Sequence, residues 1–121
     1  MTDAEINRAL TEKVLGWEWA EQSGYGDNWG WWLTKAGDWD SRKGPYPPDH
    51  PGVDVLTWDG FGLLLKALVE RDNPPEMHWD GVQWVVILEQ HEADAMCRGQ
   101  DPDLRRALRD AACKAYGIEV E

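Results

Sequence analysis

Four side chains late in the sequence come closest to a metal-binding or catalytic cluster: His91, Glu92, Asp94 and Cys97. On a helix, His91 and Asp94 would share a face, as would Asp94 and Cys97, and an imidazole with carboxylates can ligate a divalent ion. However, no second histidine stands at the spacing of a His-Glu-x-x-His helix, and charged residues are usually exposed to solvent. We therefore interpret this stretch as a solvated acidic loop and predict no metal site and no cofactor.

Neither serine of the chain has the setting of a catalytic nucleophile. Ser23 and Ser41 lie outside any Gly-x-Ser-x-Gly motif and beside no histidine, so triad chemistry is disfavoured. The glycine-rich stretch 24–30 lacks the lysine of a P-loop and precedes an expected strand rather than a helix, so it cannot cradle a phosphate in that way. His50 and His78 are isolated and are interpreted as surface or strand-edge side chains. We therefore expect that the protein is not an enzyme.

Tryptophan is the most unusual residue type, with nine copies in 121 residues, six of them between residues 17 and 39. Alternate residues of a strand point to one face, so Trp29 and Trp31 would share a face and Trp32 would take the other. A small core has limited room for such rings. One interpretation is that some of them form a stacking platform or a protein interface, and the other is that all of them fill the core. The candidate ligand-binding rings are Trp19, Trp29, Trp31, Trp32 and Trp39.

Arg105 and Arg109 lie four residues apart in an expected C-terminal helix and would offer a phosphate or carboxylate clamp on one face. The alternative is a helix whose early aspartates and late cations complement its dipole. On the first interpretation, the protein binds a small nucleotide-like ligand without catalysis. The tryptophan-rich pocket would stack the base, and the arginines would neutralise the phosphate.

The chain is strongly acidic, with 23 Asp and Glu against 12 Lys and Arg and a formal charge of −11. This balance argues against binding duplex nucleic acid through its phosphates and against binding an anionic membrane, because both need clustered cations. It suggests a second hypothesis, an acidic inhibitor that mimics nucleic acid and blocks a host defence complex. Its phosphate mimics would be the acids of the segment 76–103, namely Glu76, Asp80, Glu89, Glu92, Asp94, Asp101 and Asp103.

Apolar periodicity predicts three helices, at residues 3–15, 55–71 and 101–116, the first capped by Asp3 and ended by Gly16. Aromatic-rich or apolar runs predict four strands, at residues 17–20, 29–34, 77–79 and 82–89, the last two joined by a turn at Asp80–Gly81. A proline-rich connection spans residues 36–52. The stretch 90–103 is assigned to no strand.

The order α-β-β-α-β-β-α predicts one α+β domain over residues 1–121, a three-layer α/β/α sandwich around a four-stranded, mainly antiparallel sheet. Because residues 85–88 are continuously apolar, their strand is expected to be covered by helices on both faces. Cys97 and Cys113 fit no zinc spacing and are expected to be reduced. The acidic N-terminus does not have the pattern of a signal peptide, and no apolar run is long enough to span a bilayer, so a cytosolic location is expected.

Residues 12–17, with the sequence EKVLGW, and the pair Trp31-Trp32 resemble a family of small phage proteins, the phage ABA-sandwich domain. Their order of helix, Trp-rich hairpin, proline-containing connection, helix, hairpin and Ala-rich helix is similar over nearly the whole chain. This sequence departs from the family in a longer glycine-rich loop at 22–28 and an insertion around 90–103. The resemblance implies a fold and a viral origin but no activity. We therefore expect a phage accessory protein in the cytoplasm of the infected bacterial host, with counter-defence as its context. A homo-oligomer is an open alternative to a monomer.

Overall fold

The computed structural model describes residues 1–21, 29–34, 46–47, 49–89 and 96–119. Within these ranges there are three helices, α1 (Asp3–Leu10), α2 (Trp58–Glu70) and α3 (Leu104–Ala115), and a π-helical turn, η1 (Thr11–Leu15), extends α1. The strands are β1 (Glu18–Glu21), β2 (Gly30–Leu33), β3 (Glu76–Trp79), β4 (Trp84–Glu89) and β5 (Met96–Asp101). The α+β class and the three predicted helices are confirmed.

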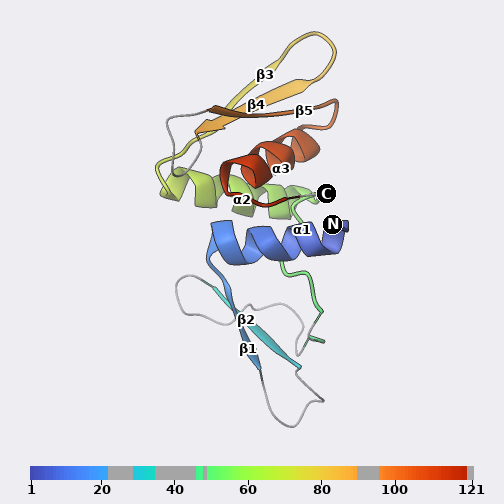
Figure 1. Cartoon of the computed structure of the whole chain (residues 1–121), viewed down its shortest axis with the longest axis vertical. Helices are drawn as coiled ribbons and strands as arrows, with labels where there is room; N and C mark the ends of the chain where they lie inside the picture. Colours follow the sequence, from blue (N-terminus) through green and yellow to red (C-terminus); the bar gives the residue numbers. More distant parts are fainter. Residues whose placement is uncertain (22–28, 35–45, 48, 90–95, 120–121) are drawn as a thin grey trace.

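The strands form two separate antiparallel sheets, β1-β2 and β3-β4-β5. Figure 1 shows the two sheets at opposite ends of the molecule, with the helices between them. The predicted single four-stranded sheet is therefore not confirmed. Among the described helices, α3 alone packs extensively against β4 and β5, so the expectation of helices on both faces of that sheet is wrong for the described residues.

All three helices run in the same direction, and each begins on the side where the chain starts (Figure 1). Between the end of η1 and the start of α2, the described chain forms β1 and β2. Strands β3, β4 and β5 carry it from the end of α2 to the start of α3. The β structure is thus the return path between parallel helices.

Strand β5 was missed by the sequence interpretation. Its sequence, MCRGQD, lacks apolar alternation, yet it pairs with β4 along its whole length, with Gly99 opposite Val86. Gly99 lies directly against α3: a Cβ there would overlap the carbonyl oxygen of Ala107 and come 2.7 Å from the amide nitrogen of Ala111. This contact joins backbone to backbone, so a hydrophobic pattern does not reveal it.

The helix ends agree with the predicted positions to within a few residues. Helix α1 is capped by Thr2, not by Asp3, in a capping box with Glu5. Gly16, with a φ of 75°, ends η1 as expected. In the second hairpin, Asp80 precedes the turn, and its Oδ1 accepts from the amides of Val82 (2.9 Å) and Gln83 (2.8 Å). The predicted hairpin is confirmed, with the centre of its turn one residue further along.

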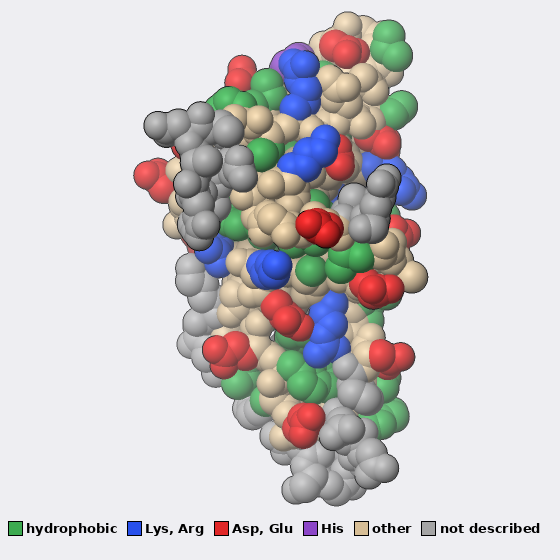
Figure 2. All heavy atoms as spheres, in the orientation of Figure 1, with side chains coloured by type: hydrophobic (Ala, Val, Ile, Leu, Met, Phe, Trp, Pro, Cys, Tyr) green, Lys and Arg blue, Asp and Glu red, His purple; other side chains and the backbone are tan. Residues whose placement is uncertain are grey.

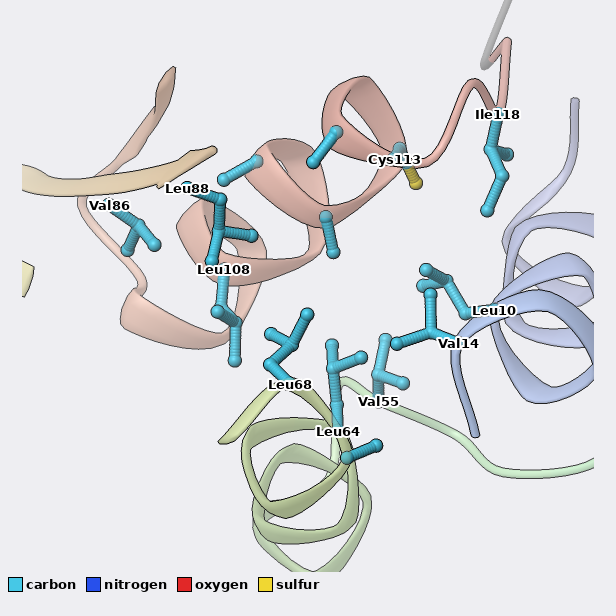
Figure 3. Close-up of a cluster of buried hydrophobic side chains, with 14 of the residues drawn as sticks. Leu10, Val14, Val55, Leu64, Leu68, Val86, Leu88, Leu108, Cys113 and Ile118 are labelled. Carbon is cyan, nitrogen blue, oxygen red and sulfur yellow. The ribbon is translucent and has the colours of Figure 1, made fainter. Parts of the chain in front are cut away.

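The core lies where the three helices meet. Figure 3 shows Leu10, Val14, Leu64, Leu68 and Leu108 pointing toward one another from α1, η1, α2 and α3. All of these side chains are buried, and each contributes roughly 1.5–3 kcal/mol relative to exposure. On the other side of α3 the core continues to the buried side chains of β4. In the part of the chain that the structure describes, no helix is both long and apolar enough to cross a membrane.

Two buried polar side chains of the first helix hold the chain that leads to α2. The hydroxyl of Thr11 donates to the carbonyl oxygen of Asn7 (2.7 Å) and accepts from the amide of Val53 (2.9 Å). The side chain of Asn7 donates to Asp54 and accepts from the amide of Val55. Because buried backbone groups must find partners, these bonds fix segment 53–55 against α1.

Cys113 is buried in the core on α3 with 1% of its surface exposed, and burial raises the pKa of its thiol from 9.0 to about 11. The thiolate is the reactive form. We therefore expect that iodoacetamide at about pH 8 modifies half-buried Cys97 and leaves Cys113 intact until the protein unfolds. Intact-mass spectrometry should show one adduct on the folded protein and two in concentrated urea.

Two adducts on the folded protein would contradict this expectation. The raised pKa also has a consequence for stability. The folded state favours the neutral thiol, so its contribution is fully present below pH 9.0 and is lost as the pH rises to about 11.

Candidate functional site

Trp32 is internal, contrary to its assignment as a candidate stacking platform. Its side chain is 0% exposed, and its indole Nε1 donates to Nδ1 of His50 (3.1 Å). Trp19 packs edge-on against it with 5.3 Å between ring centroids. The guanidinium of Arg8 lies 5.3 Å from the Trp19 ring centroid and 5.2 Å from that of Trp32. Trp32 therefore joins the β1-β2 sheet to α1 and cannot stack a ligand.

The other predicted rings divide differently. Trp19, Trp29 and Trp31 are half-buried, and Trp39 lies outside the described residues. His50, interpreted as a surface or strand-edge histidine, instead accepts from the amide of Gly52 (3.1 Å) as well as from Trp32, and stacks on Tyr46 with ring centroids 3.9 Å apart. The part of this Trp cluster that the structure describes is thus built around one fully internal ring.

The predicted arginine clamp is not assembled. Arg105 donates from Nε and Nη2 to the two carboxylate oxygens of Asp103 (3.1 and 2.9 Å). Arg109 donates from Nη1 to Asp3 Oδ1 (2.8 Å). Both arginines belong to α3, and α1 lies between α3 and the β1-β2 sheet (Figure 1). The structure therefore does not bring the two arginines together with Trp19, Trp29, Trp31 and Trp32.

Three of the proposed phosphate mimics serve local structure. Asp103 caps α3 by accepting from the amide of Arg105 (3.0 Å), and the Arg105 guanidinium holds the pKa of its carboxyl below the usual range. Asp101 accepts from the amide of Asp103 (2.8 Å). The amides of Gln83 and Val82 lower the pKa of Asp80 in the hairpin turn.

Of the remaining members of that acidic set, the structure describes only two. Glu76 and Glu89 are exposed on β3 and β4, whereas Glu92 and Asp94 lie outside the described residues, as does His91. Figure 2 shows acidic and basic side chains interspersed over the face that it displays. No group of three or more His, Cys, Asp or Glu side chains within the described ranges could hold a metal ion.

A groove with a volume of about 420 Å³ lies between η1, the β1-β2 sheet and α2. The helix α2 supplies four residues spaced three or four apart, so they share one face. Leu15 comes from the end of η1, and Trp17 and Thr34 flank the two strands. We name this hollow the Trp17 groove, and its lining consists of Leu15, Trp17, Thr34, Leu63, Lys66, Ala67 and Glu70.

The Trp17 groove combines an apolar floor with a charged mouth. Leu15, Leu63 and Ala67 supply apolar surface, and half-buried Trp17 supplies an indole. At the mouth, Lys66 Nζ and Glu70 Oε1 are 3.9 Å apart, with 74% and 49% of their side chains exposed. Such an exposed, long ion pair contributes little to stability, so both groups can turn to a ligand. The volume lies within the roughly 300–1,000 Å³ of small-molecule sites.

The sequence interpretation missed this groove. Trp17 was assigned to the first strand but was not among the candidate binding rings, and Lys66 and Glu70 are ordinary charges on an amphipathic helix. The local signal that exists is the position of Trp17 directly after Gly16, where a helix ends and the chain turns. Nothing in the local sequence indicates that Trp17 and Leu63 line the same groove, because that depends on how η1 packs on α2.

A second, smaller hollow of about 340 Å³ lies at the start of α2, lined by Gly52, Val53, Asp54, Thr57, Asp59 and Gly60. Its carboxylate Asp54 already accepts from the side chain of Asn7 (3.3 Å) and the amide of Leu56 (3.0 Å). Its described lining contains no aromatic ring, so it is a weaker ligand site than the Trp17 groove.

No family model, no curated protein and no solved structure matches this chain. The candidate site therefore rests on the geometry of the described residues.

Proposed function

We propose that the protein acts by non-catalytic binding and that the Trp17 groove takes a small nucleotide-like ligand. The observation that supports this most is an indole beside an apolar floor, with one cation and one carboxylate at the mouth. The base would stack on Trp17, because every base offers a π face to an aromatic ring. Lys66 would pair with a phosphate, and Glu70 would accept from an exocyclic amine.

The resemblance to the phage ABA-sandwich domain adds a biological context to this proposal. A phage accessory protein of this size, in the cytoplasm of an infected bacterium, would sequester a nucleotide signal of host immunity as counter-defence. We propose the Trp17 groove as the nucleotide site instead of Trp32 and the Arg105–Arg109 pair.

Calorimetric titration of the purified protein against a panel of linear and cyclic nucleotides tests the proposal. We expect one or more members to bind and Trp17→Ala to weaken that binding about 10-fold or more, since stacking contributes roughly 1–3 kcal/mol per base. Lys66→Ala should weaken it less. Trp79→Ala is the matched control, because Trp79 is 50% exposed on β3 and is not part of the groove lining. Strand β3 belongs to the sheet at the end of the molecule opposite β1 and β2 (Figure 1). Silence across the panel would overturn the proposal.

Salt dependence gives an independent test. The net charge of −11 repels an anionic ligand, and salt screens that repulsion. Affinity for a nucleotide should therefore hold or rise as salt is added. A steep loss of affinity with salt would show that clustered cations hold the ligand, in conflict with the one lysine in the described lining of the groove.

The second candidate function is the acidic inhibitor that mimics nucleic acid, favoured by the net charge of −11 and by the exposed carboxylates Glu76 and Glu89. A complex of this kind would form with a basic host defence protein and would weaken as salt is added. Pull-downs from host lysate at low and high salt test whether such a complex forms. A basic partner that is lost at high salt supports mimicry, and the absence of any partner at either salt concentration counts against it.

A further inference from the structure

The wall of the Trp17 groove is an unusual piece of backbone. In η1 the helix widens, so that the carbonyl oxygen of Thr11 accepts from the amides of both Gly16 and Trp17, the latter at 3.1 Å. A π turn contains one more residue than an α turn and is rare in helices, where it is often found at functional sites. The extra residue decides the direction in which the chain leaves the helix. Trp17 is the second residue after the end of η1.

One side chain from another helix holds this wide turn. Arg71, the residue that ends α2, donates from Nε to the carbonyl oxygen of Val14 (2.8 Å) and from Nη2 to that of Lys13 (3.0 Å). The last carbonyls of a helix have no partner within the helix, so these two bonds satisfy groups that would otherwise need water. The guanidinium also lies 5.7 Å from the ring centroid of Tyr116, beyond the end of α3.

Arg71 therefore joins the two elements between which the groove lies. Leu15 and Trp17 lie on the η1 side, and Glu70, the neighbour of Arg71, lies on the α2 side. If the turn relaxed to α geometry, the residues after it would rotate by roughly 100° about the helix axis. Trp17 would then leave its place in the lining of the groove.

We infer that Arg71 is the positioning residue of the Trp17 groove, which keeps η1 in its wide form and thereby holds the indole of Trp17 where a ligand can stack. Arg71 touches no ligand in this role. For the ligand itself the inference rests on the function proposed above, but the position of Trp17 can be measured without any ligand.

The test compares Arg71→Gln and Arg71→Lys with the matched control Arg109→Gln, which removes an ion pair between α1 and α3 away from the groove. The ¹H–¹⁵N signals of the Trp17 amide and indole, recorded well below the unfolding temperature, should move in Arg71→Gln, move less in Arg71→Lys and stay in place in Arg109→Gln. Affinity for the nucleotide that the wild type binds best should fall about 10-fold in Arg71→Gln, which loses both carbonyl contacts, and about 3-fold in Arg71→Lys, which can keep one. It should not change in Arg109→Gln.

The two ideas fail in distinguishable ways. If the wild type binds no nucleotide, the proposed function fails while the Trp17 signals still test Arg71. If those signals stay in place in Arg71→Gln, or if Arg71→Gln binds as tightly as the wild type, the positioning role is overturned. A loss of thermal stability shared by Arg71→Gln and Arg109→Gln, without movement of Trp17, would show that Arg71 serves stability alone.

Discussion

Gly99→Ala is expected to lower the free energy of unfolding by about 3 kcal/mol, a large share of the ~5–15 kcal/mol that stabilises a domain. The added methyl group would overlap the Ala107 carbonyl oxygen and approach the Ala111 amide nitrogen to 2.7 Å. Both are backbone atoms of α3, so no flexible side chain can move aside. Strand β5 would have to separate from α3, which opens the largest interface between a sheet and a helix in the described structure. Urea denaturation followed by circular dichroism measures the change.

Gly62→Ala is the matched control for this substitution. Gly62 lies inside α2, where an added Cβ has no heavy atom within 4 Å. Alanine favours helix over glycine, so this variant should gain roughly 0.5–1 kcal/mol. A Gly99→Ala variant as stable as Gly62→Ala would mean that β5 does not lie against α3.

Trp32→Ala should be the most destabilising of the tryptophan substitutions, at about 3–5 kcal/mol. The ring is fully buried, so its loss leaves a cavity, and His50 loses the donor of a 3.1 Å hydrogen bond. Trp32→Phe should lose less, because it refills most of the cavity without restoring that bond. Thermal and urea unfolding of the three proteins give the values.

Trp58→Ala serves as the comparison for Trp32→Ala. Trp58 is 61% exposed at the start of α2, where its main contacts are the guanidinium of Arg105 at 4.7 Å and the edge of Phe61. Its truncation should cost about 1 kcal/mol or less. If Trp32→Ala lost as little unfolding free energy as Trp58→Ala, Trp32 would be a surface ring. It could then belong to the stacking platform predicted from sequence.

The helices could be predicted from sequence because their information is local. Apolar residues three and four apart, the stop at Gly16 and the acidic start of α3 each act within a few residues. The layer order could not be predicted in this way. Pairing between the two hairpins depends on where the helices place them. In the described structure the two hairpins lie at opposite ends of the molecule and do not pair with each other. Strand β5 escaped because its defining residue, Gly99, contributes by having no side chain.

The candidate site shows the same division between local and distant information. The spacing of the tryptophans indicated a cluster. How deeply each ring is buried, however, is set by partners elsewhere in the chain, as His50 is for Trp32. The arginine clamp failed because Asp3, at the other end of the sequence, pairs with Arg109. The residues that line the Trp17 groove come from η1, α2 and the strand flanks, which tertiary packing brings together. They therefore share no sequence motif.

The parallel course of the helices gives part of the acidity a structural purpose. Three helices that begin on one side place their positive dipole ends together at one edge of the molecule. Each of these helix starts has an aspartate, Asp3 for α1, Asp59 for α2 and Asp103 for α3. These carboxylates offset a local positive potential that antiparallel helices would have cancelled among themselves. Part of the acidity behind the net charge of −11 thus stabilises the helix starts.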